Sequence, residues 1–263
     1  MLKKRLITCL FLMNGMLVRS EKFNYHNALG NPIHQLERYN DWRVDELIYI
    51  DISRQDTYDL GRYDTKVKIK DNILDIISEV SKKCFIPLTF GGRIRTIQDI
   101  RERLKRGADK ITINTIAIEN PDFITEAAGI FGSQCIVVSI DVKINDKGEY
   151  EVYKEFGQIP TGMSSVEWAK KVELLGAGEI FLNSIDRDGT GEGYDLDLIK
   201  MVSESVNIPV IACGGVGKFE DFVDGIKIGK ASAVAAGNIF NFTEISAINA
   251  KKLMKENGIE VRI

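Results

Sequence analysis

Histidine is almost absent from this chain: His26 and His34 are the only two among 263 residues. Both fall in or near polar connections, which argues against histidine-based acid–base catalysis and against a histidine-rich metal site. Cysteine is also sparse and too scattered for a metal-binding motif. All the cysteines lie in or beside apolar runs, as small buried side chains do in a reduced cytoplasm: Cys9, Cys84, Cys135 and Cys213. We expect neither a metal nor a cofactor.

Long apolar runs and long basic runs are missing as well. No run reaches the ~18 residues that a membrane-spanning helix needs. The net charge of −3 and the absence of a basic run disfavour nucleic acid as a partner. The start, Lys3-Lys4-Arg5 followed by the apolar run 6–13, imitates a signal peptide, but Asn14-Gly15 interrupts the run and no cleavage site follows. The sequence therefore predicts a first core strand there, no membrane contact and a cytoplasmic protein.

The sequence does contain a duplication. Segments 86–92 and 208–215 are apolar runs that contain Ile-Pro and end in Gly-Gly. Further apolar runs flank both and correspond between the halves: 46–51 and 111–114 in the first, 179–184 and 233–238 in the second. Self-similarity of this size determines the fold, and glycine pairs at strand ends let backbone N–H groups approach an anion. The repeat predicts two similar halves with one phosphate site each.

Eight short apolar runs, rich in Ile and Val, indicate strands that are buried on both faces. They are 6–13, 46–52, 84–90, 110–114, 135–141, 179–185, 208–213 and 232–237. Helix-like segments alternate with them: 32–42, 66–83, 96–106, 120–130, 164–175, 195–206 and 219–228. This pattern predicts an α/β protein, a (βα)8 TIM barrel built of two similar half-barrels over residues 1–263, with its active site at the carboxyl ends of the strands. A doubly wound open sheet is the alternative.

Two connections are unusually long. Residues 14–31 are polar and aromatic, and such a loop after a barrel strand is either a lid or a disordered excursion. Residues 144–162 follow the fifth strand and contain the turn sequence Asn145-Asp146-Lys147-Gly148. A small hairpin is predicted there.

Candidate chemistry gathers at the strand ends. Overlaying the halves aligns Asp141, at the end of the fifth strand, with Phe11 in the first. Burial raises the pKa of a carboxyl group, which would make Asp141 an acid or base. Phe11 occupies the place where a second carboxylate would complete the pair. The chain thus carries half of an acid–base dyad, unless Asp141 only caps its loop.

Two sets of residues are candidates for a bisphosphate-type pocket. In the second half, the turn 186–190 stands beside two glycine-containing strand ends, and its candidates are Asp188, Gly189, Gly214, Gly215, Gly237 and Asn238. In the first half the candidates are Gly92, Arg93, Asn114 and Thr115.

Charged residues also mark the opposite ends of the strands. Each of four stands immediately before an apolar run: Arg5, Glu46, Lys110 and Glu179. They would form a ring of alternating sign around the amino-terminal end of the barrel. Charges near a core are costly unless they pair. The alternative is a set of unrelated rim charges.

Segments 107–114, 131–141, 179–190 and 208–215 resemble the cyclase subunit of imidazole glycerol phosphate synthase, HisF. In that family the barrel receives ammonia from a glutaminase docked on its amino-terminal face and passes it to a ribulosyl-phosphate substrate with two phosphates. The resemblance implies that the four rim charges form the ammonia gate. It places Asp109 at the glutaminase interface. It places further residues in the substrate pocket: Asp51, Asn114, Thr115, Asp141, Asp188 and Gly189.

The departures from the family pattern cluster at the carboxyl ends of the strands. Phe11 replaces the first catalytic aspartate, Arg19 the loop lysine, Arg93 a glycine and Asn183 a threonine. Asp141 and Asn183 remain as the catalytic candidates, and Arg19 as a phosphate-binding one. Such a pattern resembles the HisF paralogues of surface-sugar amidination, which work beside a HisH-type glutaminase and an N-acetyl-sugar amidotransferase.

The sequence therefore predicts a barrel subunit that conducts ammonia from a HisH-type glutaminase for the amidination of a surface-glycan sugar. It also predicts a phosphorylated small-molecule substrate. Two alternatives stay open: a histidine-biosynthetic cyclase with a substituted acid, and a non-catalytic phosphate-binding scaffold barrel.

Overall fold

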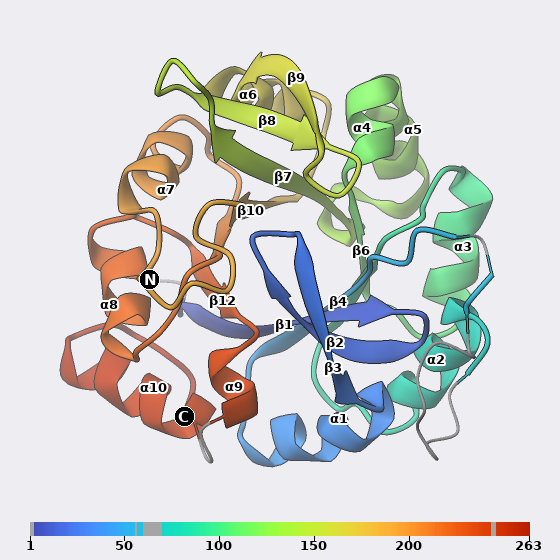
Figure 1. The fold of residues 1–263 in the computed structure, drawn as a ribbon, viewed down its shortest axis with the longest axis horizontal. Coiled ribbons are helices and arrows are strands. Elements are labelled where there is room, and N and C mark those ends of the chain that lie inside the picture. Colours follow the sequence, from blue (N-terminus) through green and yellow to red (C-terminus); the bar gives the residue numbers. More distant parts are fainter. Residues whose placement is uncertain (1–2, 56, 60–69, 243–245) are drawn as a thin grey trace.

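The computed structural model describes residues 3–55, 57–59, 70–242 and 246–263, and eight parallel strands form a closed barrel at its centre (Figure 1). In spatial order they are β1 (Arg5–Met13), β4 (Glu46–Asp51), β5 (Leu88–Gly91), β6 (Lys110–Ile113), β7 (Ile136–Ile144), β10 (Glu179–Ser184), β11 (Val210–Cys213) and β12 (Ala233–Ala236). The pairing of β7 with β10 and of β12 with β1 closes the sheet. The predicted TIM barrel is confirmed, and the open-sheet alternative is wrong.

The barrel has two apolar cores. Side chains that alternate along the strands fill the interior, and their apolar members are Ile7, Cys9, Ile48, Val137, Phe181, Ile211, Cys213, Ala233 and Ala235. The outward-facing side chains pack against the surrounding helices and form the larger core. Burial on both faces explains why the strands appear in the sequence as continuous apolar runs.

A ring of helices covers the barrel (Figure 1). Each of the seven predicted helices has a counterpart: α1 (Pro32–Asp41), α2 (Ile73–Ser81), α3 (Ile97–Lys105), α5 (Asp122–Phe131), α6 (Ser165–Leu174), α7 (Leu196–Ser203) and α8 (Glu220–Lys227). The prediction for α2 began too early, because the side chain of Asn72 accepts a hydrogen bond from the backbone N–H of Asp75 and so caps the helix there. Residues 66–69 lie outside the described residues.

Three helices were missed in the sequence: α4 (Thr115–Glu119), α9 (Ile239–Phe242) and α10 (Ser246–Glu256). The first two are too short to show a helical period. The helix α10 is tied to the barrel by a buried ion pair, in which Lys251 Nζ lies 2.8 Å from Asp45 Oδ1. Asp45 also accepts a hydrogen bond from the backbone N–H of Leu6, so one carboxylate joins the last helix to the first strand.

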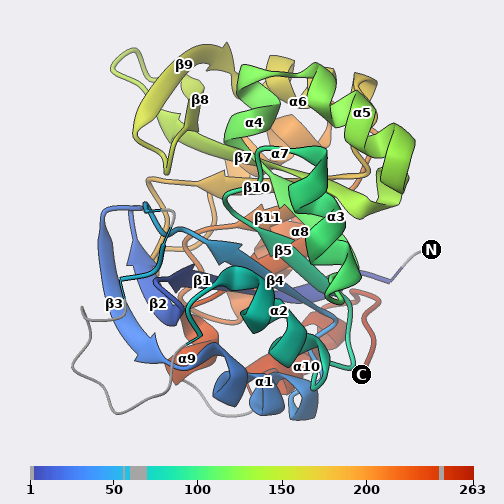
Figure 2. The ribbon, with the colours of Figure 1, turned by 90° about the vertical axis from the view of Figure 1, so that its right-hand side faces the viewer.

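The two long connections fold into β-hairpins. In the first, β2 (Met16–Glu21) pairs with β1 and with β3 (Tyr25–Gly30), so the segment is an ordered hairpin and not a disordered excursion. In the second, β8 (Tyr150–Lys154) pairs with β7 around the predicted turn, and β9 (Ile159–Ser164) adds a third strand. Figure 2 shows both hairpins at one end of the barrel and the chain termini at the other.

Two remaining predictions concern the cysteines and membrane contact. Cys9 and Cys213 are buried as expected, whereas Cys84 and Cys135 are only half-buried, because they precede β5 and β7 at the rim of the barrel. No helix within the described ranges is long and apolar enough to cross a membrane.

Candidate functional site

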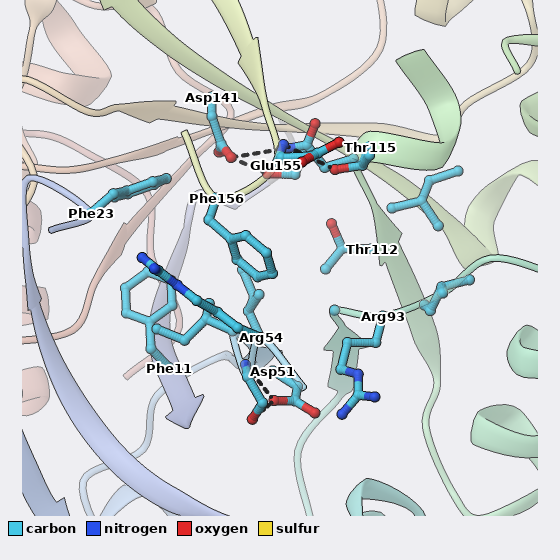
Figure 3. Close-up of a pocket in the computed structure, with 18 of the residues that line it drawn as sticks. Phe11, Phe23, Asp51, Arg54, Arg93, Thr112, Thr115, Asp141, Glu155 and Phe156 are labelled. Carbon is cyan, nitrogen blue, oxygen red and sulfur yellow. Dashed lines mark hydrogen bonds between the residues drawn. The ribbon is translucent and has the colours of Figure 1, made fainter. Parts of the chain in front are cut away.

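The end of the barrel that carries the hairpins holds a large pocket, with a volume of about 600 Å³ (Figure 3). Its floor is formed by residues at the carboxyl ends of neighbouring strands, which is where TIM-barrel active sites lie. Several predicted site residues meet here: Phe11, Asp51, Gly92, Arg93, Asn114, Thr115, Asp141 and Asn183.

Asp141 is the buried acid of this pocket. Its Oδ2 accepts a hydrogen bond from Asn114 Nδ2 at 2.6 Å, and its Oδ1 accepts one from Asn183 Nδ2 at 3.2 Å. Burial, the largest effect, raises the pKa of Asp141 from 3.8 to about 6, although these donors favour the charged form. A carboxyl group with this pKa exchanges its proton near neutral pH, which suits general acid–base catalysis.

Two buried polar atoms on β6 and at its end have no hydrogen-bond partner among the described residues. They are the hydroxyl of Thr112 and the amide oxygen of Asn114. Both residues line the pocket. Unpaired buried polar atoms are costly, so each marks a place where a ligand can form a hydrogen bond.

Asp51, at the end of β4, is also buried but has a full set of partners. Its carboxylate accepts hydrogen bonds from the backbone N–H of Ser53 at 3.0 Å and from the Tyr58 hydroxyl at 2.9 Å. Burial and this carboxylate raise the pKa of Tyr58. Asp51 therefore shapes the loop after β4 and is less suited than Asp141 to proton transfer.

The turn after β5 is held in a left-handed conformation. Gly92 has a φ of +90°, and a Cβ atom there would lie 2.0 Å from the carbonyl oxygen of Asp51. The guanidinium of buried Arg103 donates a hydrogen bond to the carbonyl of Gly92 at 3.1 Å. The next residue, Arg93, has a φ of +57° and lines the pocket, with its side chain on the Asp51 side (Figure 3).

A second pocket of about 300 Å³ lies at the end of the second half-barrel. The predicted residues Arg19, Asp188, Gly189, Gly214, Gly215, Gly237 and Asn238 all line it. The carboxylate of Asp188 accepts a hydrogen bond from the Ser20 hydroxyl at 2.6 Å and so holds the first hairpin over this pocket. Burial raises the pKa of Asp188.

At the opposite end of the barrel, the four rim charges form a closed ring. Arg5 lies 2.7 Å from Glu46 and 3.0 Å from Glu179, and Lys110 lies 3.2 Å from each of the same two carboxylates. Positive and negative side chains therefore alternate around the ring, and 9–19% of each side chain is exposed. Burial lowers the pKa of Arg5, but Glu179 and Glu46 outweigh it and raise that pKa.

The barrel interior between this ring and Asp141 is mostly apolar. The strand register adds three hydroxyl side chains on the inner face, because Thr89 pairs with Ile48, Thr112 with Val137 and Ser139 with Phe181. Asp109 stands next to Lys110 on the same rim. It is exposed, and its carboxylate accepts a hydrogen bond from the backbone N–H of Leu88 at 2.8 Å.

Several pocket residues were not predicted from the sequence, among them two aromatic residues and an arginine. Phe23, Arg54 and Phe156 line the large pocket, but all three come from connecting segments. Phe23 and Phe156 have positive φ angles, 56° and 60°, which bring their rings over the pocket. An aromatic residue with positive φ has no sequence signal, because such a conformation is unfavourable for it in isolation. Among the described residues, no group of three His, Cys, Asp or Glu side chains is placed to hold a metal ion.

We expect Asp141 to make stability depend on pH. Its folded-state pKa of about 6 exceeds the unfolded value of 3.8, so the folded state binds this proton more tightly. The resulting stabilisation is complete below pH 3.8 and is lost as the pH rises through 6, a change of about 3 kcal/mol. Denaturant unfolding of the wild type and of Asp141→Asn should therefore diverge by this amount across that range. Parallel pH profiles would contradict the assignment.

A family model described as "Histidine biosynthesis protein" matches residues 5–246. The match covers all eight barrel strands and both pockets, so it extends over nearly the whole chain. The family comprises barrel enzymes of the HisA and HisF type, which agrees with the closed barrel and with the position of the pockets at the carboxyl ends of its strands. This chain belongs to the histidine biosynthesis protein family.

Proposed function

We propose that this chain is a HisF-like synthase subunit of a glutamine amidotransferase complex. In this proposal a HisH-type glutaminase docks at the amino-terminal end of the barrel, and ammonia travels through the interior to the Asp141 pocket. The ammonia is used to amidinate a surface-glycan sugar, with an N-acetyl-sugar amidotransferase as a further partner.

The observation that carries the proposal is the closed ring of Arg5, Glu46, Lys110 and Glu179. A buried ring of four charges costs desolvation energy, so an ordinary barrel gains little from it. A ring at the entrance of an apolar interior has a use if it excludes water and ions while a small neutral molecule passes. Ammonia is such a molecule, and the pocket around Asp141 lies at the far end of that interior.

The surface around the ring supports a protein partner. Phe85 precedes β5 and is 86% exposed, and Leu174 ends α6 before β10 and is 87% exposed. Both lie on the side of the barrel where the strands begin, as does Asp109. A partner docked on this side would bury both of these apolar side chains.

Isotope transfer tests the proposed function. The chain would be combined with a HisH-type glutaminase and an N-acetyl-sugar amidotransferase, and supplied with glutamine labelled with ¹⁵N in the side-chain amide. Label should enter the amidino group of the sugar even when unlabelled ammonium is present outside, because channelled ammonia does not mix with the solvent. A product that takes its nitrogen from the unlabelled ammonium would contradict the proposal, and glutaminase activation without any product would favour a scaffold.

The histidine-biosynthetic cyclase is the second candidate, and Asp141 favours it. An acid with a pKa of about 6, held by Asn114 and Asn183, is a general acid–base group of the kind a cyclase needs. The absence of a second carboxylate at Phe11 argues against it.

We expect inorganic phosphate to occupy the smaller pocket before the larger one. The smaller pocket combines six glycines with Arg19, whereas the first half places a long side chain, Arg93, where the family has glycine. Crystals soaked in phosphate should show density beside Gly215 at lower concentration than beside Asn114. Gly215→Ala is the control: its φ is +104° and a Cβ would lie 2.2 Å from the Gly193 carbonyl, so the site should be lost. Density beside Asn114 alone would refute this order.

A further inference from the structure

Phe11 separates the two pockets at the carboxyl ends of the strands. It lines both of them, and among the described residues it is the only one that does. Most residues of the large pocket come from the β4–β7 side, and most residues of the small pocket come from the β10–β12 side. The side chain of Phe11 therefore stands where a ligand that spans both half-barrels would have to pass.

A second aromatic side chain, Phe23, continues the barrier between the pockets above Phe11. We call Phe11 and Phe23 together the wall. Phe23, at the tip of the β2–β3 hairpin, meets Phe11 edge to face with the ring centroids 6.4 Å apart. Aromatic pairs in this geometry attract each other beyond their buried area. The wall thus runs from a barrel strand to the hairpin above it.

The upper half of the wall is fixed in place. The backbone N–H groups of Phe23 and Lys22 donate hydrogen bonds to the side chain and to the carbonyl of Asp188, at 3.3 and 2.9 Å. On its other side the Phe23 ring packs against the backbone of Gly157, where a Cβ would lie 2.8 Å from the ring. Phe23 is therefore held between the β10–α7 loop and the β8–β9 tip.

We propose that the two pockets bind two separate ligands, and that the large pocket takes a ring compound carrying a single anionic group. This deepens the proposed function, because it states what lies at the end of the ammonia path. It needs neither ammonia nor a glutaminase to be tested, so either proposal can fail while the other stands.

The chemistry of the large pocket selects the ligand class. Figure 3 shows Arg54 and Arg93 on the Asp51 side, with Asp141 across the cavity. Guanidinium groups bind carboxylate and phosphate in two-pronged geometry. Phe156 and the wall provide apolar faces for a ring.

The pocket also offers hydrogen-bond partners to polar groups on the ring of the proposed ligand. The hydroxyl of Thr112 and the amide oxygen of Asn114 are buried and unpaired among the described residues. A sugar hydroxyl or an amide N–H would satisfy the Asn114 oxygen, and Thr112 can donate or accept. These atoms would place the ring beside Asp141.

Linked ligands give a direct test of the separation. When two phosphate groups on one molecule can reach two sites together, affinity exceeds that of either group alone by about 10²–10⁴. Isothermal titration would compare methyl phosphate with a series of α,ω-alkanediol bisphosphates of increasing length. In the wild type no bisphosphate should bind more than about threefold tighter than methyl phosphate, because the wall keeps one molecule from reaching both pockets.

Opening the wall should restore the advantage of linkage. In Phe11→Ala, at least one bisphosphate of the series should bind about tenfold or more tighter than methyl phosphate. Phe11→Leu, which keeps more of the packing, should show a smaller gain if Phe11→Ala fails to fold. Phe156→Ala is the matched control, since it removes an aromatic ring that lines only the large pocket, and it should show no gain. A linkage advantage in the wild type, or none in either Phe11 variant, overturns the proposal.

A second titration tests the ligand class with phenyl phosphate and benzoate as probes. At least one should bind to the wild type in a site that survives Gly215→Ala and is weakened about tenfold by Arg54→Ala combined with Arg93→Ala. Stronger binding of benzoate would identify a carboxylate ligand, and stronger binding of phenyl phosphate a phosphate ester. Loss of all binding in Gly215→Ala, or full binding in the double arginine variant, would overturn the assignment to the large pocket.

Discussion

Replacing Lys110 with alanine is expected to reduce glutamine-dependent product formation by roughly tenfold or more, equivalent to about 1.4 kcal/mol. Lys110 supplies two of the four ion pairs in the ring. Without it, Glu46 and Glu179 share the single charge of Arg5, so water enters the gap and ammonia escapes from the path. The measurement is product formed per glutamine hydrolysed, with the glutaminase present.

Ammonium salt separates a leak from a general loss of activity. Ammonia supplied in solution can enter at the carboxyl end of the barrel, so ammonium-dependent product formation should change little in the Lys110 variant. Glu46→Gln should give the same split between the two nitrogen sources, because it removes a charge with little change in shape. Lys82→Ala breaks an exposed ion pair with Glu79 and is the control. If both ring variants couple glutamine hydrolysis to product as well as the wild type does, the ring is not a gate.

The ring variants should also lose stability. Removing one partner of a buried ion pair costs about 3–5 kcal/mol, because the remaining charge stays buried without compensation. The loss here should fall at the lower end of that range, since 9–19% of each ring side chain is exposed and water screens part of the charge. Activity assays therefore need to be run well below the melting temperature of each variant.

The barrel was predictable because its signals are local and repeated. Each parallel strand is buried on both faces, so each appears as an apolar run, and the duplication supports the closure of the sheet. The ring charges could be found because each stands directly before a strand, and the strand register then brings Arg5, Glu46, Lys110 and Glu179 together.

The upper part of the pocket was not predictable for a physical reason. Phe23 and Phe156 reach the site through left-handed backbone conformations in two hairpin tips, and these depend on contacts between the tips and the β10–α7 loop. The sequence identified Phe11 as a missing carboxylate. Phe11 also forms a wall with Phe23. This contact joins a barrel strand to a hairpin tip, and no local sequence pattern predicts it.

The purified chain is expected to turn over the ribulosyl-phosphate substrate of histidine biosynthesis about 10²–10⁴-fold more slowly than a cyclase with two carboxylates, even when ammonium is abundant. Asp141 supplies one acid–base group at the large pocket, and Phe11 cannot transfer a proton. The wall that Phe11 forms with Phe23 also blocks a substrate with two distant phosphates. For the same reasons the gene should fail to support growth of a histidine auxotroph that lacks the cyclase.

Phe11→Asp and Phe11→Asn distinguish these two effects. Both open the wall, but only the first adds a carboxylate, so a gain seen in both variants measures access and a further gain in Phe11→Asp measures proton transfer. The new carboxylate should also raise the pKa of Asp141 above about 6, because two like charges in one pocket resist ionisation together. The pH at which Phe11→Asp reaches half of its maximal rate should therefore be higher than in Phe11→Asn. Wild-type turnover close to that of an ordinary cyclase, or growth of the auxotroph, would show that one carboxylate suffices and would favour the histidine-biosynthetic alternative.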